Sequence, residues 1–183
     1  MWVIYNDDEA AAFKDLSSAS DRAAAIVAAS LLEDRLEMAL RLRMIDDDKV
    51  AAELFRSSGP LGSFASKIAL GYLLKMYSDA ARRDLVCIKD ISNQFAHHLD
   101  IRDFQSQSIK NKTQNLRLVE KHVFPYGTNP EEAPKDVGIK MFEQNLTEQL
   151  ADPRRRYLLA VSFFVSGLTP IGRTSSNPHT TPF

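Results

Sequence analysis

Apolar residues recur every three or four positions along much of this chain, which is the spacing of one helix face. The clearest case is the segment Asp21–Ile45, whose apolar positions are Ala25, Ala28, Ala29, Leu32, Leu36, Ala39, Leu40 and Met44. Val27, Leu31, Met38 and Leu42 widen this face beyond one stripe. Ser20 stands where a helix N-cap belongs, and Asp21 places a negative charge at the positive end of the helix dipole. We therefore predict a central core helix here.

The same spacing predicts further helices and no strands. Residues 1–58 contain no glycine or proline, and alternating runs of Val, Ile and Thr are absent. The additional predicted helices are Asp7–Leu16, Lys49–Arg56, a helix through Phe64 and Met76, a helix from Ser78-Asp79 to Ala96, Gln105–Lys121, Met141–Leu150, and a helix from Asp152-Pro153 to Gly167. The sequence therefore predicts an all-α fold, a compact bundle of about six to eight helices.

Length and composition indicate a single helical domain. The chain has 183 residues, of which 44% are hydrophobic and 26% charged, as in ordinary globular domains. We expect the domain to span residues 1–172, with its core in 20–168 and a proline-rich loop over 125–134. Residues 173–183, rich in Thr, Ser, Asn and Pro, are expected to be a disordered tail.

Several classes of protein are disfavoured by what the sequence lacks. The single cysteine, Cys87, cannot form an internal disulfide, and no signal-peptide pattern or long apolar run occurs, so we expect a cytoplasmic protein with no membrane segment. The 23 basic and 24 acidic residues give a net charge of −1, which argues against direct DNA binding. No phosphate-binding loop, serine elbow or helical metal-ligand pair occurs, so we predict no cofactor, no metal and no enzymatic activity.

Asp90, Asn93 and His97 form the first candidate polar cluster. At about 100° per residue they share a narrow arc opposite Ile88 and Phe95. A histidine beside a carboxylate and an amide can move protons or bind a ligand. Alternatively, His97 ends the helix, where a cation is favoured, and Asn93 bonds to a neighbouring helix.

Lys67 belongs to the second candidate cluster. Its stem runs over apolar positions one and two turns further along its helix. Glu33 and Glu37 stand one turn apart and repel unless a cation intervenes, and Arg41 can pair with Glu37, which leaves Glu33 for Lys67. The alternative is a solvated Glu33, Glu37 and Arg41 face, with Lys67 reaching out to water.

Two basic segments complete the candidate sites. Arg154, Arg155 and Arg156 lie at the positive end of the last predicted helix, where arginines are unfavourable unless an anion or acidic partner is present. They are therefore a candidate interaction site. Lys110, Lys112, Arg117 and Lys121 make 105–122 basic, but no aromatic residues alternate with them, so a solvated face is favoured over a surface for nucleic acid.

Four blocks of the sequence, taken together, resemble the bacterial mannitol operon repressor (MltR-like) family. They are Ser20-Asp21-Arg22, Leu31-Leu32-Glu33-Asp34-Arg35-Leu36-Glu37, Gly59-Pro60-Leu61-Gly62-Ser63-Phe64-Ala65-Ser66-Lys67-Ile68 and Asn93-Gln94-Phe95-Ala96-His97. The resemblance implies an all-helical cytoplasmic regulator linked to repression of sugar-alcohol use and lacking a recognisable DNA-reading module. Glu33, Asp34, Lys67, Asn93 and His97 match polar positions of that family.

The Asn93 and His97 spacing also resembles HEPN-type helical domains, many of which are ribonucleases with an arginine five residues before the histidine. Here that position is Ser92, which supplies no positive charge for a phosphorane-like transition state. The leading hypothesis is thus a non-enzymatic transcriptional regulator that acts through protein partners. A degenerate HEPN-like nucleotide- or RNA-binding domain is the alternative.

We also expect a homodimer. Leu31, Met38 and Leu42 extend the apolar surface of the central helix, and Phe163, Phe164 and Val165 add an almost wholly apolar segment near the C-terminus. Part of this surface would be covered by a second copy.

Overall fold

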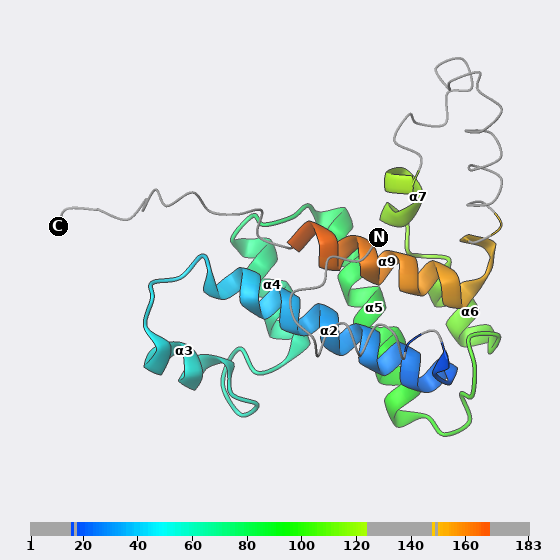
Figure 1. Ribbon diagram of the computed structural model, residues 1–183, viewed down its shortest axis with the longest axis horizontal. Helices are drawn as coiled ribbons and strands as arrows, with labels where there is room; N and C mark the ends of the chain where they lie inside the picture. The colour runs from blue at the N-terminus through cyan, green and yellow to red at the C-terminus, as the bar shows by residue number, and fades with distance from the viewer. Residues whose placement is uncertain (1–15, 17, 124–147, 149, 169–183) are drawn as a thin grey trace, which may run out of the picture.

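The computed structural model describes residues 16, 18–123, 148 and 150–168 of the chain. These residues contain seven helices and no strand, which confirms the all-α prediction (Figure 1). The helices are α2 (Asp21–Arg41), α3 (Asp48–Phe55), α4 (Phe64–Leu73), α5 (Asp79–His97), α6 (Gln107–Thr113), α7 (Leu118–Val123) and α9 (Pro153–Leu168). The predicted helices Asp7–Leu16 and Met141–Leu150, the loop 125–134 and the tail 173–183 lie wholly or largely outside the described residues.

Helix α2 is the centre of the bundle and packs against α9, α5 and α4. Its buried residues include the small side chains of Ala24, Ala25, Ala28 and Ala29, which let neighbouring helices approach closely. Tyr157 of α9 is fully buried and donates a hydrogen bond to the carbonyl of Ala25 over 2.9 Å. The helix ends at Arg41 rather than at Ile45, because the amides of Arg43 and Met44 bond three residues back in tight turns.

Serine and aspartate side chains begin the helices where the sequence predicts them. Ser20 accepts a hydrogen bond from the amide of Ala23, Asp47 from that of Val50, and Ser78 from that of Ala81. Each bond satisfies one of the amides that a helix N-terminus leaves without an intrahelical partner. The starts of α2, α3 and α5 therefore follow from local sequence.

The predicted single helix Gln105–Lys121 is wrong, because the structure divides this segment into α6 and α7. The chain turns after Thr113, and Arg156 of α9 donates to the carbonyls of Thr113 and Leu116 over 2.9 and 2.6 Å. Buried Asp84 of α5 accepts from the amide of Leu118, which begins α7, over 2.8 Å. Two distant side chains thus satisfy the backbone groups that the break exposes.

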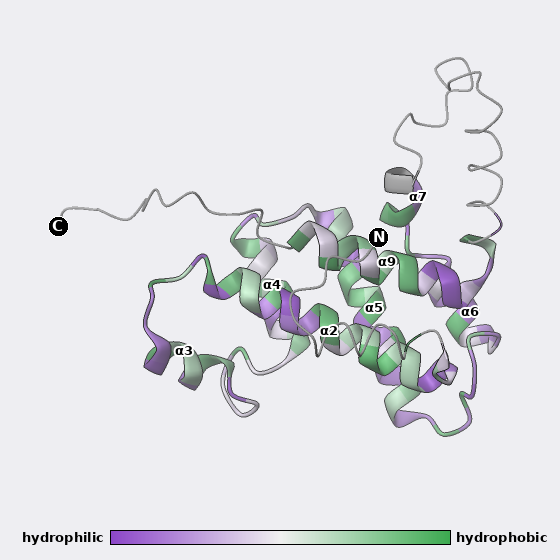
Figure 2. Ribbon diagram, in the orientation of Figure 1, coloured by the Kyte–Doolittle hydropathy of each residue, from purple (hydrophilic) through white to green (hydrophobic). Residues whose placement is uncertain are grey.

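Aromatic rings fill the centre of the core. The ring of Phe104 lies 4.9 Å from that of Phe95 and 5.3 Å from that of Tyr157, centroid to centroid, in tilted contacts. Figure 2 shows hydrophobic and hydrophilic residues mixed along each helix, as in amphipathic helices around one core. Among the residues that the structure describes, no helix combines the length and the apolar character that a membrane span requires.

Helix α3 lies apart from the other helices (Figure 1). Its one buried residue is Phe55. The following turn returns the chain to α4, and there the amide of Leu61 donates to the carbonyl of Leu54 over 2.9 Å. A Cβ atom on Gly59 would lie 2.4 Å from that same Leu54 oxygen, so only glycine fits this turn. We call residues 42–62 the α3 arm.

Candidate functional site

Lys67 of α4 binds two carboxylates of α2. Its Nζ atom lies 2.7 Å from Oε1 of Glu33 and 2.9 Å from Oε2 of Glu37. The side chain of Lys67 is only 5% exposed, whereas those of Glu33 and Glu37 are 26% and 22% exposed. Of the two arrangements that the sequence leaves open, the structure has the ion pair between helices, and the solvated arrangement in which Lys67 reaches out to water is wrong.

The charges of this cluster stabilise one another. Burial alone would raise the pKa of Glu37, but hydrogen bonds and charges of Lys67 and Arg41 outweigh it and hold that pKa below its ordinary value. Burial alone would lower the pKa of Lys67, but Glu33 and Glu37 outweigh it and raise that pKa. Both groups are therefore ionised at neutral pH, which suits a structural connection better than proton transfer.

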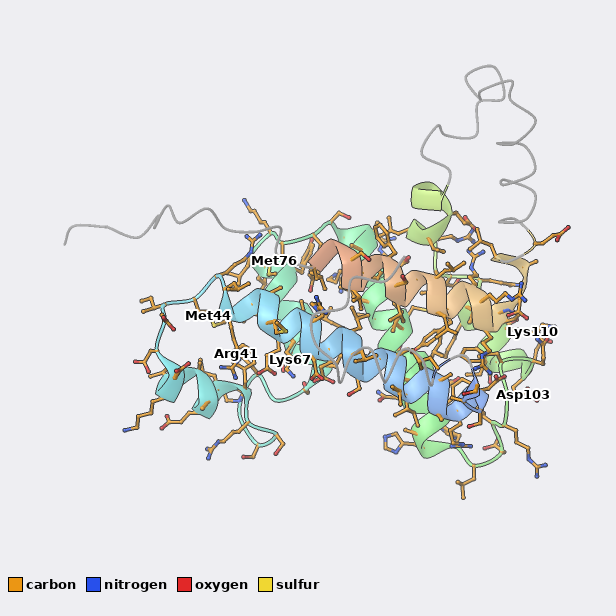
Figure 3. The ribbon with its side chains drawn as sticks, in the orientation of Figure 1. Arg41, Met44, Lys67, Met76, Asp103 and Lys110 are labelled. Carbon is orange, nitrogen blue, oxygen red and sulfur yellow. The ribbon has the colours of Figure 1, made fainter. Side chains whose placement is uncertain are left out.

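Arg41 extends this cluster to the α3 arm. Its Nε and Nη2 atoms donate to Oε1 of Glu37 over 2.9 and 2.8 Å, as the sequence predicts. Its guanidinium also lies 4.6 Å from the ring centroid of Phe55, the buried residue of α3. In Figure 3, Lys67 and Arg41 lie close together, and Met44 lies just beyond the end of α2. We call Glu33, Glu37, Arg41 and Lys67 the charge network; it connects α4 to α2 and α2 to α3.

A pocket of about 240 Å³ adjoins the charge network where α2 meets the α3 arm. Its lining consists of Arg41, Leu42, Met44, Ile45, Asp46, Asp47, Asp48 and Ala51. This pocket was not predicted from the sequence. The available signal was the run from Leu42 to Asp48, which changes from apolar to acidic just after the helix ends and is visible as a colour change in Figure 2.

Asp90, Asn93 and His97 lie on the outward side of α5. Asn93 and His97 are exposed, and Asp90 is half-buried with Oδ1 2.8 Å from Nζ of Lys89. The expectation that Asn93 bonds to a neighbouring helix inside the structure is wrong, because that side of α5 faces solvent. His97 is the last residue of α5, as the helix-end interpretation predicts.

The end of α5 is held by a residue that the sequence analysis did not single out by its chemistry. Arg22 of α2 donates to the carbonyls of Phe95, His98 and Ile101, the last two over 3.0 and 2.7 Å. Asp21 accepts from the amide of Phe104 over 2.8 Å. Arg22 precedes Glu33 by eleven positions, or about 16 Å along α2. Arg22 binds next to His97, so the cluster of Asp90, Asn93 and His97 is separate from the charge network.

Asp34 and Arg35 directly follow Glu33 on α2. Asp34 is exposed, whereas Arg35 is only 1% exposed and is the largest fully buried side chain among the described residues. The sequence places both in the same family-like block, but the structure gives them opposite environments.

Two of the three consecutive arginines of α9 bind groups of this chain. Arg154 lies 2.5 Å from Oδ1 of Asp21 and also donates to the carbonyls of Leu16 and Ala19. Buried Arg156 pairs with Glu120 in addition to its two backbone contacts. The interaction-site prediction is therefore wrong for Arg154 and Arg156, because their acidic partners are internal. Arg155 alone is exposed.

Two further observations concern the cysteine and the metal-binding side chains of the described residues. Burial raises the pKa of the Cys87 thiol to about 11, so the thiol stays protonated at neutral pH. Within the described ranges, no group of three or more His, Cys, Asp or Glu side chains is placed to hold a metal ion.

Comparison with known proteins gives matches in structure only. No protein-family model matches the chain, and no curated protein matches its sequence. A chain in the X-ray structure of the MtlR–HPr complex from Escherichia coli is similar, with a TM-score of 0.61 and 16% identity over 87% of this chain and 96% of that chain. A possible transcriptional regulator, YggD from Shigella flexneri 2a strain 2457T, has a TM-score of 0.61 and 15% identity over 91% of this chain and 100% of that chain. The chain has the fold of MtlR and YggD.

This MtlR-like fold confirms what the four sequence blocks predict about architecture. The structure also joins the blocks in pairs. Ser20-Asp21-Arg22 binds the backbone at the end of the Asn93 to His97 block, and Glu33 and Glu37 bind Lys67 of the glycine-containing block. Much of the polar pattern behind the resemblance therefore holds helices together.

Proposed function

We propose that this protein is a non-enzymatic transcriptional regulator of the sugar-alcohol-utilisation type that acts in the cytoplasm through a protein partner. The observation that carries the proposal is the MtlR-like fold, which extends over most of both chains and which occurs in MtlR in a complex with another protein, HPr. YggD, a possible transcriptional regulator, has the same fold. Partner binding by this chain is inferred from that likeness.

The charges of the described residues support a partner protein rather than DNA. Specific DNA binders concentrate Lys and Arg on one face to neutralise phosphates. Here Arg22, Arg154 and Arg156 donate to backbone carbonyls inside the fold, and Arg41 and Lys67 bind carboxylates. Over the whole chain 24 acidic residues balance 23 basic ones, so the chain has no excess of positive charge to attract a phosphate backbone.

The test has two parts, one for regulation and one for DNA. Deleting the gene should change a restricted set of transcripts, and the wild-type chain should restore them. Purified protein mixed with fragmented genomic DNA at roughly physiological salt should enrich no sequence by itself. An unchanged transcript profile during growth on sugar alcohols would overturn the regulatory proposal. Sub-micromolar sequence-specific DNA binding would overturn the proposal that the protein acts through a protein partner. RNA binding that is lost in His97→Ala would favour the HEPN-like alternative instead.

We further propose a homodimer formed through the outward face of α2. Val27 and Met38 are exposed on this helix, whereas exposed Leu42 lies beyond its last residue, Arg41. Phe164 and Val165, by contrast, are buried in the core, so the predicted contribution of these two residues to a dimer surface is wrong. Light scattering at about 50 µM should give a dimer mass for the wild type and a monomer mass for Met38→Glu. A monomeric wild type would contradict the proposal.

A further inference from the structure

The lining of the pocket beside α2 includes two apolar residues that the fold leaves uncovered. Ile45 is 85% exposed and Leu42 41%. Val50, next to the lining residue Ala51, is 51% exposed on the same short stretch between the end of α2 and the start of α3. Exposed apolar residues scattered singly are ordinary, but such residues gathered at a concave site are typical of an interaction surface.

The size of the pocket favours a side chain over a metabolite. Small-molecule sites usually enclose about 300–1,000 Å³ and bury most of the ligand. This pocket measures about 240 Å³, and its apolar lining comes from Leu42, Met44, Ile45 and Ala51. Met44 is unbranched and can adjust to the shape of a partner side chain. The pocket therefore fits one apolar anchor residue of another protein.

The charge around the pocket determines which partner residues are favoured next to the apolar anchor. Asp46, Asp47 and Asp48 all line the pocket, and all three are exposed. The one basic lining residue is Arg41, whose guanidinium is already bound by Glu37. A partner with Lys or Arg next to its apolar anchor would gain favourable contacts here, whereas an acidic partner would be repelled.

The α3 arm holds this surface in place before any partner arrives. Arg41 stacks on Phe55, the Leu61 amide bonds to the Leu54 carbonyl, and Gly59 permits the close turn between them. Asp47 caps α3 by accepting from the amide of Val50 over 3.0 Å. A surface that is ordered in advance loses less conformational entropy on binding.

We infer that this pocket is a docking site for a protein segment in which an exposed apolar side chain is flanked by Lys or Arg. The anchor enters between Ile45 and Ala51, and the basic neighbours lie against Asp46 and Asp48. The inference rests on the proposed function, since it assigns the surface through which the regulator meets its partner.

The probe is a fluorescein-labelled amphipathic helical peptide of leucine and lysine, and its counterpart with glutamate in place of lysine is the charge control. Binding to the full chain is measured by fluorescence anisotropy at several salt concentrations. We expect the lysine peptide to bind, with affinity that falls as salt rises, and the glutamate peptide not to bind.

The decisive variant is Ile45→Ser/Asp46→Asn, and Leu99→Ser/Asp100→Asn is its matched control. Leu99 is 86% exposed, against 85% for Ile45, and is likewise followed by an exposed aspartate, at the far end of α2 from the pocket. The first variant should weaken binding of the lysine peptide about tenfold or more, which corresponds to ~1.4 kcal/mol, and the second should leave it unchanged. Circular dichroism verifies that both remain folded.

Equal affinities of the two variants would overturn the docking site. The transcript assay separates this failure from failure of the proposed function. If wild-type protein restores the transcripts and Ile45→Ser/Asp46→Asn restores them equally well, the docking site is wrong and regulation stands. If deleting the gene leaves the transcripts unchanged, so that wild-type protein has nothing to restore, the proposed function is wrong.

Discussion

Lys67 and Glu33, 34 positions apart in the chain, meet across 2.7 Å between α4 and α2. Glu37 completes the site from the next turn of α2 at 2.9 Å. Without the cation, two carboxylates one helical turn apart would face each other. The ion pair therefore both joins two helices and removes a repulsion within one of them.

Lys67→Met tests this connection. It should lower the free energy of unfolding by about 1–3 kcal/mol, less than a fully buried pair would, because water can still reach the partly exposed carboxylates. Urea denaturation measures the change. The triple variant Lys67→Met/Glu33→Gln/Glu37→Gln should recover more than half of the loss, since no charge is then left unpaired. A neutral effect of Lys67→Met would show that the pair contributes nothing to stability.

The pH dependence of stability should reveal Glu37. Its pKa in the folded state lies below the ordinary value of 4.5, so its contribution is present above about pH 4.5 and is lost as the pH falls through the lower folded value. The pKa of Lys67 is raised above 10.5, so its contribution persists up to about pH 10.5 and is lost only as the pH rises through the higher folded value. We expect a stability plateau between these limits.

Glu37→Gln isolates this effect. Between pH 5 and 3 the wild type should lose more stability than the variant, because only the wild type loses the ionised form of Glu37. Asp84 acts in the opposite sense: burial raises its pKa, so its protonation favours the folded state. Both proteins contain Asp84, so its contribution to the pH dependence cancels when they are compared. Glu53→Gln, at an exposed position of α3, is the control. Parallel urea midpoints for wild type and Glu37→Gln over this pH range would contradict the prediction.

The elements that local residues determine could be predicted from the sequence, whereas for the charge network the sequence left two arrangements open. Ser20, Asp47 and Ser78 cap the helices that they precede, and the Glu33 and Glu37 spacing indicates the need for a cation. Helical periodicity identifies the face of α5 that carries Asn93, but it does not show whether another helix packs on that face. In the structure Asn93 is exposed to solvent.

Contacts between distant segments account for the rest. The break between α6 and α7 depends on Asp84 and Arg156, which lie in other helices. Arg154 reaches Asp21 across 133 positions of the chain. The pattern of a single sequence carries no information about such pairings. For the three arginines it correctly predicted the need for an acidic partner, but it placed that partner on another molecule instead of within this chain.

The three arginines of α9 offer an internal comparison. Arg154→Ala and Arg156→Ala should each lower the free energy of unfolding by about 1–3 kcal/mol, because each leaves a carboxylate and two backbone carbonyls without their donor. Exposed Arg155→Ala should change it by less than about 0.5 kcal/mol. Thermal or urea denaturation of the three variants measures the order. Equal effects at all three positions would contradict these structural roles.

Two glycines should respond oppositely to alanine. In Gly59→Ala the new Cβ would lie 2.4 Å from the Leu54 oxygen, so the turn must open and the α3 arm must loosen. A Cβ on Gly167, near the end of α9, meets nothing within 4 Å, so Gly167→Ala should be neutral or slightly stabilising. Because α3 lies apart from the other helices, the loss should appear as local opening rather than as a lower global stability.

Amide hydrogen exchange therefore measures the effect of Gly59→Ala. The amides of α3 should exchange at least about fivefold faster in this variant, equivalent to ~1 kcal/mol, while those of α2 and α9 keep their rates. Gly59→Ala should also weaken binding of the leucine and lysine peptide, since it disorders one wall of the pocket. Gly167→Ala should leave that binding unchanged. Unchanged exchange in α3 would mean that the turn tolerates a side chain, and that the arm is not held by the close approach of Gly59 to Leu54.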